Sequence, residues 1–312
     1  MSNHSKYQNL LDACKGLPPT PTAVVHPCDR SSLEGAIGAA RLGLIRPILV
    51  GPQHRIRDAA ALAGIDLGGI PIVDAPHSHA AAAQAVELVL KGEAEALMKG
   101  SLHTDELMGA VVRRDRGLRT ARRISHCFVM DVPSYEQPII ISDAAVNIQP
   151  TLEEKVDIVQ NAIDLAHALG FPEVRVAVLS AMETVNPQVP STIEAAALCK
   201  MAERGQITGA VLDGPLALDN AISLHAAEIK KIDSPVAGRA NVLIVPDLDA
   251  GNMLAKSLTF LAGADAAGIV LGARVPIILT SRADSEIARM ASCAVAVLVA
   301  LARRTAAPKA VA

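Results

Sequence analysis

A hydroxyl and a guanidinium stand next to each other near the C-terminal end of the chain. The apolar run PIILT at 276–280 is followed by Ser281 and Arg282, then by Asp284 and an apolar helical pattern up to about residue 301. Ligands of α/β proteins bind where a parallel strand ends and a helix begins. Free N–H groups at a helix start and the forked donors of Arg both suit phosphate oxygens. The same residues also fit a helix cap made by Ser281 with Asp284, and the two interpretations are compatible.

A second set of polar side chains follows the expected strand at 96–99. Lys99, Ser101 and His103 stand at the end of this strand. An ammonium group, a hydroxyl and an imidazole at that place suit an anion or a polarised carbonyl. His103 alone fits equally well as the polar first residue of the next helix. Two further donors come later in the same stretch, Arg119 and Ser125.

Acidic and amide side chains follow two expected strands in the middle of the chain. Asp213 ends the run AVLD, and Asp247 and Asn252 come after VLIVP. The carboxyl ends of parallel strands meet at one edge of a sheet, so we expect these loops to gather there. The carboxylates fit metal ligands, hydroxyl binders, or turn and cap residues, and these alternatives stay open.

Short β-branched runs alternate with helical patterns along almost the whole chain, which predicts an α/β protein with mainly parallel sheets. Thr151 with Glu154 predicts a capping box at the start of one helix. Ten strands are many for one open sheet, so we expect two sheets, with a boundary near 131–138. The expected strands are 22–26, 47–50, 71–73, 96–99, 138–142, 174–180, 210–213, 242–245, 269–271 and 277–279.

Composition and charge exclude several kinds of partner and location. The chain has 312 residues, a formal net charge of −3 and 2% aromatic residues, which argues against nucleic acid as the main partner. The longest apolar run, 291–302, is too short to cross a bilayer, and the N-terminus does not resemble a signal peptide. Five scattered cysteines fit reduced thiols in a cytoplasm better than disulfides or zinc. We therefore predict a cytoplasmic protein with no membrane segment and no metal site.

Together these segments resemble the phosphate acetyltransferase and phosphate butyryltransferase family, most closely its short, butyryl-type branch. The matching segments are MKGSLHTDELM (98–108), GLRTARRISHCFVM (117–130), ISDAAVNIQPTLEEKVDIVQNA (141–162), VLDGPLALDNAIS (211–223), VPDLDAGNMLAKSL (245–258) and GARVPIILTSRADS (272–285). The resemblance implies reversible acyl transfer between coenzyme A and inorganic phosphate, by direct thiolate attack in a ternary complex. It also implies a homodimer in which coenzyme A is a substrate and no cofactor is tightly bound.

The resemblance implies two three-layer α/β/α sandwich domains with mainly parallel sheets and an interdomain cleft that holds the site. The last strand and helix of the chain resemble part of the site in the N-terminal sheet. We therefore predict a discontinuous first domain, 1–134 plus 275–312, and a second domain at 135–274.

By the same resemblance, Ser281 donates to the carbonyl oxygen as it becomes negative, and Arg282 holds the phosphate. The acetyl-type enzymes have an aspartate, proposed as the base for the thiol, where this chain has Ala288. Asp284 or Glu286 is expected to take its place, or the thiol ionises with help from local positive charge. The expected substrate contacts are Lys99, Ser101, His103, Arg119, Ser125, Asp213 and Asn252.

Two other functions remain as alternatives. The first is a catalytically silent regulatory domain, since acyltransferase-like domains occur fused to malic enzymes. The second is a metal-dependent dehydrogenase of the isocitrate or isopropylmalate type, which needs an acidic triad and a nicotinamide site that this sequence does not offer. The complete Ser281–Arg282 pair favours an active acyltransferase, with acetyl preferred over butyryl.

Overall fold

The computed structural model describes residues 5–280 and 284–305 of the chain. It divides into two compact units, each made of more than one segment. The first unit comprises Tyr7–Arg122 and Ala267–Ala312, and the second comprises Met1–Lys6 and Arg123–Ala266. The domain boundaries expected from the sequence, 134/135 and 274/275, stay a prediction.

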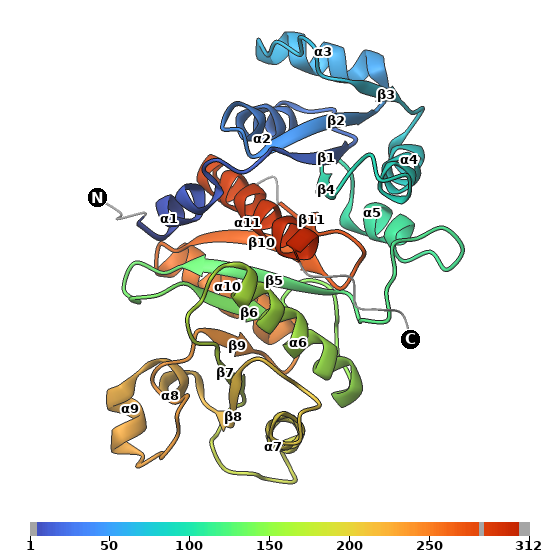
Figure 1. Cartoon of the computed structure of the whole chain (residues 1–312). Helices are drawn as coiled ribbons and strands as arrows, with labels where there is room; N and C mark the ends of the chain where they lie inside the picture. Colours follow the sequence, from blue (N-terminus) through green and yellow to red (C-terminus); the bar gives the residue numbers. More distant parts are fainter. Residues whose placement is uncertain (1–4, 281–283, 306–312) are drawn as a thin grey trace. The chain divides into compact units, whose positions relative to one another are not determined.

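The first unit is a mainly parallel sheet with helices on both faces. Its strands run in the order β3-β2-β1-β4-β11-β10, and all neighbours are parallel except β11 and β10. The helices α2 and α4 lie on opposite faces of β1 and β2 (Figure 1). The strands are β1 (Thr20–Val25), β2 (Ile45–Gly51), β3 (Ile72–Asp74), β4 (Ala96–Lys99), β10 (Asp265–Leu271) and β11 (Ile277–Ile278). The helices are α1 (Ser5–Cys14), α2 (Arg30–Arg41), α3 (Gln53–Ala63), α4 (Ser78–Leu90), α5 (Thr104–Val111) and α11 (Glu286–Thr305).

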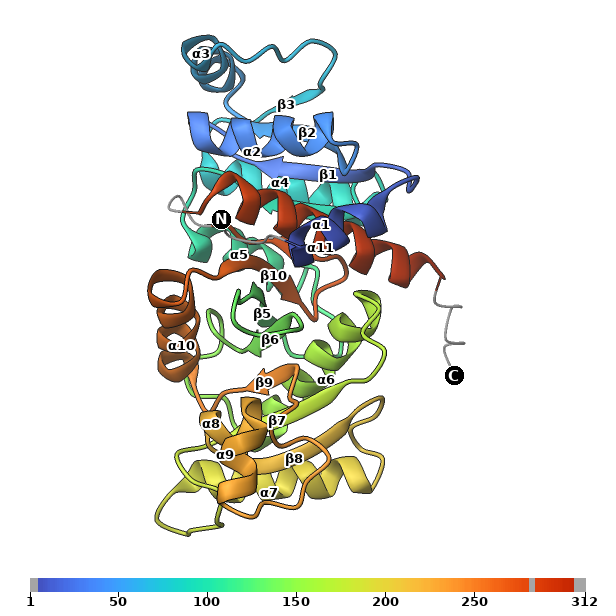
Figure 2. The ribbon, with the colours of Figure 1, turned by 90° about the vertical axis from the view of Figure 1, so that its left-hand side faces the viewer.

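The second unit repeats this plan with five strands in the order β5-β6-β9-β7-β8. β5 and β6 are antiparallel, and the other pairs are parallel. The helices α6 and α10 cover opposite faces of the sheet (Figure 2). The strands are β5 (Ser125–Asp131), β6 (Ile139–Ser142), β7 (Arg175–Leu179), β8 (Val211–Leu216) and β9 (Val242–Ile244). The helices are α6 (Leu152–Ala168), α7 (Pro190–Glu203), α8 (Leu218–Ile222), α9 (Leu224–Ile229) and α10 (Leu248–Leu261).

The apolar runs of the sequence form the buried strands because both faces of each sheet are covered. In β1, for example, Ala23, Val24 and Val25 are all completely buried. The capping box is confirmed, since the Thr151 hydroxyl accepts from the Glu154 N–H, and the Glu154 carboxylate accepts from the Thr151 N–H at 2.9 Å. The mixed α/β fold with mainly parallel strand pairing is therefore as expected.

The sequence did not predict β5, and the presence of this strand explains why the segment 131–138 breaks the pattern. β5 was not among the ten expected strands; it pairs antiparallel with β6, with Met130 opposite Ile139. The two prolines and the tyrosine of this segment break the pattern because the chain reverses direction there. Tyr135 anchors the reversal, donating from its N–H to the Val132 carbonyl and from its hydroxyl to the Ala240 carbonyl.

Within the described part of the chain, none of the helices combines the length and the apolar character needed to cross a membrane.

Candidate active site

The carboxyl ends of three neighbouring strands meet at one edge of the sheet of the first unit. β4 pairs in parallel with β1 on one side and with β11 on the other. The segments that follow these strands, 26–29, 100–103 and 279–280, therefore emerge side by side at the edge where open α/β sheets bind ligands. Ser281 and Arg282 come next in the sequence and lie outside the described residues.

Ser101 joins the end of β4 to the end of β1. Its hydroxyl donates to the His26 carbonyl at 2.7 Å and accepts from the Cys28 N–H at 3.0 Å. The hydroxyl hydrogen is thus committed to the backbone, which gives Ser101 a positioning role at this edge. A direct contact between Ser101 and substrate stays a prediction.

His26 belongs to this edge although the sequence did not single it out. Its φ of 54° lies in the left-handed region, and the residue is 5% exposed. Burial, assisted by the charge of Arg55, lowers the pKa of its imidazole, so the ring is neutral at pH 7. Nδ1 lies 3.4 Å from the Ser101 hydroxyl, and Nε2 has no hydrogen-bond partner among the described residues. The only signal in the sequence was a polar residue directly after the buried run AVV.

A small hollow opens at this edge, between the start of α2 and the ends of β4 and β11. Its volume is about 20 Å³, room for one oxygen-sized group. It brings together two cations, Lys99 and Arg289, and one carboxylate, Asp29. The Asp29 carboxylate caps α2 by accepting from the Ser32 N–H at 2.8 Å. The hollow is further lined by Ser31, Ser32, Met98, Gly100 and Thr280.

The start of the last helix identifies its N-cap. α11 starts at Glu286, and the Ser285 hydroxyl accepts from the Ala288 N–H at 3.0 Å. Ser285 is therefore the N-cap, so the interpretation in which Ser281 caps this helix with Asp284 is wrong. Asp284 itself is half-buried and directly precedes the cap.

Proteins of known family match the segments of the chain that contain these residues. The family model described as phosphate acetyl/butaryl transferase matches residues 77–297. The chain is 66% identical over 302 residues to the phosphate acetyltransferase of Rhizobium meliloti, covering 97% of this chain and 96% of that protein. The chain belongs to this family.

Two further relatives show the breadth of this acyltransferase family. The phosphate butyryltransferase of Clostridium acetobutylicum is 41% identical over 272 residues, covering 87% of this chain and 90% of that protein. The crystal structure of a branched-chain phosphotransacylase from Enterococcus faecalis V583 matches with a TM-score of 0.79 at 29% identity, covering 90% of this chain and 99% of that one. The protein is thus an acyltransferase with the α/β fold of the phosphotransacylases.

Two of the expected substrate contacts of this acyltransferase lie on the surface of the first unit. The N–H of His103 donates to the Glu106 carboxylate at 2.8 Å at the start of α5, as the helix-start interpretation expects. Arg119 is exposed, and its backbone pairs with that of Ala273. Arg119 is therefore open to an anion from solution, whereas His103 already has a structural role.

Three more expected contacts lie in the second unit. Ser125 is completely buried, and its hydroxyl accepts from Asn161 Nδ2 at 2.9 Å. The Asp213 carboxylate accepts from the next backbone N–H at 2.8 Å, and Asn252 Nδ2 donates to the Ala144 carbonyl at 3.3 Å. These bonds give each residue a local structural role, and their contact with substrate stays a prediction.

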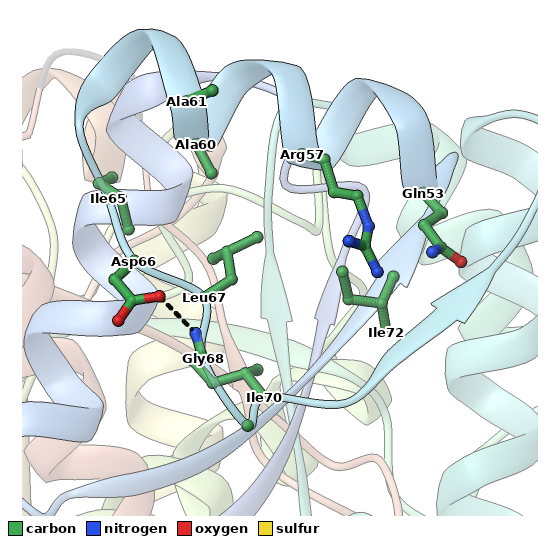
Figure 3. Close-up of a pocket in the computed structure, with 11 residues that line it drawn as sticks. Gln53, Arg57, Ala60, Ala61, Ile65, Asp66, Leu67, Gly68, Ile70 and Ile72 are labelled. Atoms are coloured by element: carbon green, nitrogen blue, oxygen red, sulfur yellow. Dashed lines mark hydrogen bonds between the residues drawn. The ribbon is translucent and has the colours of Figure 1, made fainter.

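A larger cavity, of about 520 Å³, lies beneath α3 in the first unit. Gln53 and Arg57 stand at one end of it, and Ile70 and Ile72 form part of its apolar wall (Figure 3). None of the residues expected from the sequence lines this cavity. We therefore place the candidate site of the acyltransferase at the carboxyl edge, where the chemically suited side chains converge.

Proposed function

We propose that this acyltransferase transfers an acetyl group reversibly between coenzyme A and inorganic phosphate. The observation that carries the acetyl assignment is the 66% identity to a phosphate acetyltransferase, against 41% to a phosphate butyryltransferase. The motif wording resembled the butyryl-type branch, so butyryl phosphate is the second substrate to test. Coenzyme A takes part as a substrate, with no tightly bound cofactor.

The reaction is a direct displacement at the acyl carbon in a ternary complex. The thiolate of coenzyme A forms a C–S bond while the bond between the carbonyl carbon and the phosphate oxygen breaks. The thiol proton passes to a base or to water, and phosphate leaves as an anion. Such a transition state needs donors aimed at the developing oxyanion and positive charge near the phosphoryl group.

In this proposal Ser281 supplies the oxyanion donor and Arg282 holds the phosphate. Their support comes from their place in the chain, directly after the edge where β1, β4 and β11 end. Lys99 ends β4 at that edge and supplies further positive charge, and exposed Arg119 is the next anion contact.

The residue that accepts the thiol proton is the part of the site in which this chain differs from the acetyl-type enzymes. Ala288 occupies the position of the aspartate of acetyl-type enzymes and is 6% exposed on α11. Asp284 and Glu286 are the nearest carboxylates along the chain and the proposed replacements. If neither accepts the proton, the thiol ionises with help from the surrounding positive charge alone.

We further propose that the enzyme works as a homodimer in the cytoplasm, without a nucleic-acid or membrane partner. All five cysteines are free thiols in the structure, as a reducing compartment would keep them. Light scattering should give a particle of about twice the 32.4 kDa of one chain. A mass of one chain at micromolar concentration would contradict the dimer.

One assay tests the activity. The purified protein is mixed with coenzyme A and either acetyl phosphate or butyryl phosphate, and thioester formation is followed. We expect turnover with both, with the larger kcat/KM for acetyl phosphate. No thioester from either substrate would favour the silent regulatory domain instead.

A further inference from the structure

The Arg289 side chain crosses from the first turn of α11 to the start of α2. Its Nη1 donates to the Ser31 hydroxyl at 3.0 Å and to the Asp284 carbonyl at 2.8 Å. Gly35 of α2 makes room for it, since a Cβ at Gly35 would lie 3.1 Å from Arg289 Cδ and 3.3 Å from Met98 Cε. The guanidinium is thus held in one place by two elements.

Among the described residues, no carboxylate forms a hydrogen bond or an ion pair with this guanidinium. Within residues 5–280 and 284–305, both of its hydrogen bonds go to neutral oxygens, and no carboxylate forms an ion pair with it. Its Nε is buried and has no hydrogen-bond partner. Partly burying a cation without a counter-charge is unfavourable. The hydrogen bonds within the described part of the chain leave this guanidinium held by neutral oxygens.

The charge faces a place suited to an oxyanion. Arg289 and Lys99 line the small hollow at the carboxyl edge, and the Asp29 carboxylate in its wall already accepts a bond from the helix it caps. Two cations and one carboxylate therefore line this hollow. The volume of about 20 Å³ admits an oxygen of a phosphoryl group.

We propose that Arg289 is a second cationic contact for the phosphoryl group, binding its oxygens together with Lys99. This assignment rests on the proposed function, because that function supplies phosphate and acyl phosphate as ligands. Arginine suits this role through the planar fork of its donors. The competing explanation is that Arg289 only fastens α11 to α2.

The test compares substitutions at two arginines of the same helix. Arg303 is the matched control, because its Nη1 also donates to backbone carbonyls, those of Ala273 and Arg274. We expect Arg289→Gln to raise the KM for phosphate and acetyl phosphate about 10- to 100-fold. The KM for coenzyme A should change less than about twofold, and Arg289→Lys should retain part of the phosphate affinity. Arg303→Gln should leave all three KM values at the wild-type level.

A second measurement does not depend on catalysis. Inorganic phosphate should raise the Tm of the wild-type protein and of Arg303→Gln, and the same phosphate concentration should raise the Tm of Arg289→Gln much less. If the wild type makes no thioester, the proposed function fails, and this measurement alone decides whether Arg289 binds phosphate. An Arg289→Gln variant with a lowered Tm but unchanged phosphate KM and unchanged protection by phosphate overturns the inference, and Arg289 is then a structural tether.

Discussion

Gly100 lies so close to β1 that a Cβ on it would be 2.3 Å from the Val25 carbonyl oxygen. The N–H of Gly100 donates to that same carbonyl at 2.9 Å, so the two strands cannot separate to make room. This contact sets the spacing of the edge from which Lys99 and Ser101 emerge. We expect Gly100→Ala to lower the free energy of unfolding by at least about 2 kcal/mol, as overpacking of a tight core does. Urea denaturation measures it.

Gly109 provides the control for that substitution. It lies in α5, and a Cβ there would have no heavy atom within 4 Å apart from the backbone of its own helix and its chain neighbours. Since alanine favours a helix over glycine, Gly109→Ala should leave the free energy of unfolding unchanged or raise it by up to about 1 kcal/mol. An equal loss in the free energy of unfolding at both positions would show that the close approach of Gly100 to β1 does not determine the effect of the substitution.

A buried histidine in the second unit predicts a loss of stability in acid. His126 is 1% exposed, and burial lowers the pKa of its imidazole from 6.5 to about 4, although the charge of Asp143 opposes part of the shift. The unfolded chain therefore takes up a proton at a higher pH than the folded chain does. Stability is fully present above pH 6.5 and is lost as the pH falls toward 4.

Between pH 7 and pH 5, we expect His126 to account for a loss of about 2 kcal/mol in the free energy of unfolding. In His126→Asn this part of the pH dependence should disappear, while exposed His225 of the same unit serves as control and His225→Asn should retain it. Denaturation curves at pH 7 and at pH 5 give the free energy of unfolding of each variant. An unchanged slope in His126→Asn contradicts the prediction.

The sequence predicted most strands and the start of α6, because these depend on residues that are close together in the chain. The strand at 96–99 and the capping box of Thr151 with Glu154 appear where the sequence indicated. β5 was not predicted, although its sequence SHCFVMD contains the short apolar run CFVM, because its antiparallel pairing with β6 forms only beyond the turn.

The site was predictable only where residues stand at strand ends. Lys99 and Ser101 were found in this way, whereas Arg289 sits in the helical run EIARMAS, where nothing local distinguishes it from a surface arginine. Its place next to Ser31 arises from packing between helices 258 residues apart. His26 likewise shows its character only once β1 and β4 are paired.

Ser285 gives a prediction that separates helix capping from catalysis. Its hydroxyl satisfies the Ala288 N–H in the first turn of α11. Removing an N-cap hydroxyl typically costs about 1 kcal/mol. We expect Ser285→Ala to lower the free energy of unfolding by that amount and to leave kcat for thioester formation within about twofold of wild type. Thermal unfolding and the acyl transfer assay, run on the same preparation, measure both quantities.

Ser281 should show the opposite behaviour, because its proposed role is a bond made mainly in the transition state. Deleting such a donor typically lowers kcat about 10²- to 10³-fold, so Ser281→Ala should lose turnover with little change in KM or Tm. Arg282→Ala should lower kcat and also raise the KM for phosphate and acyl phosphate, since a guanidinium holds the anion in the ground state as well. Binding of coenzyme A, followed by calorimetry, should survive both changes. Wild-type turnover and phosphate saturation in Arg282→Ala would remove this pair from the site, and the Lys99–Arg289 hollow and Arg119 would then be the candidates for phosphate binding.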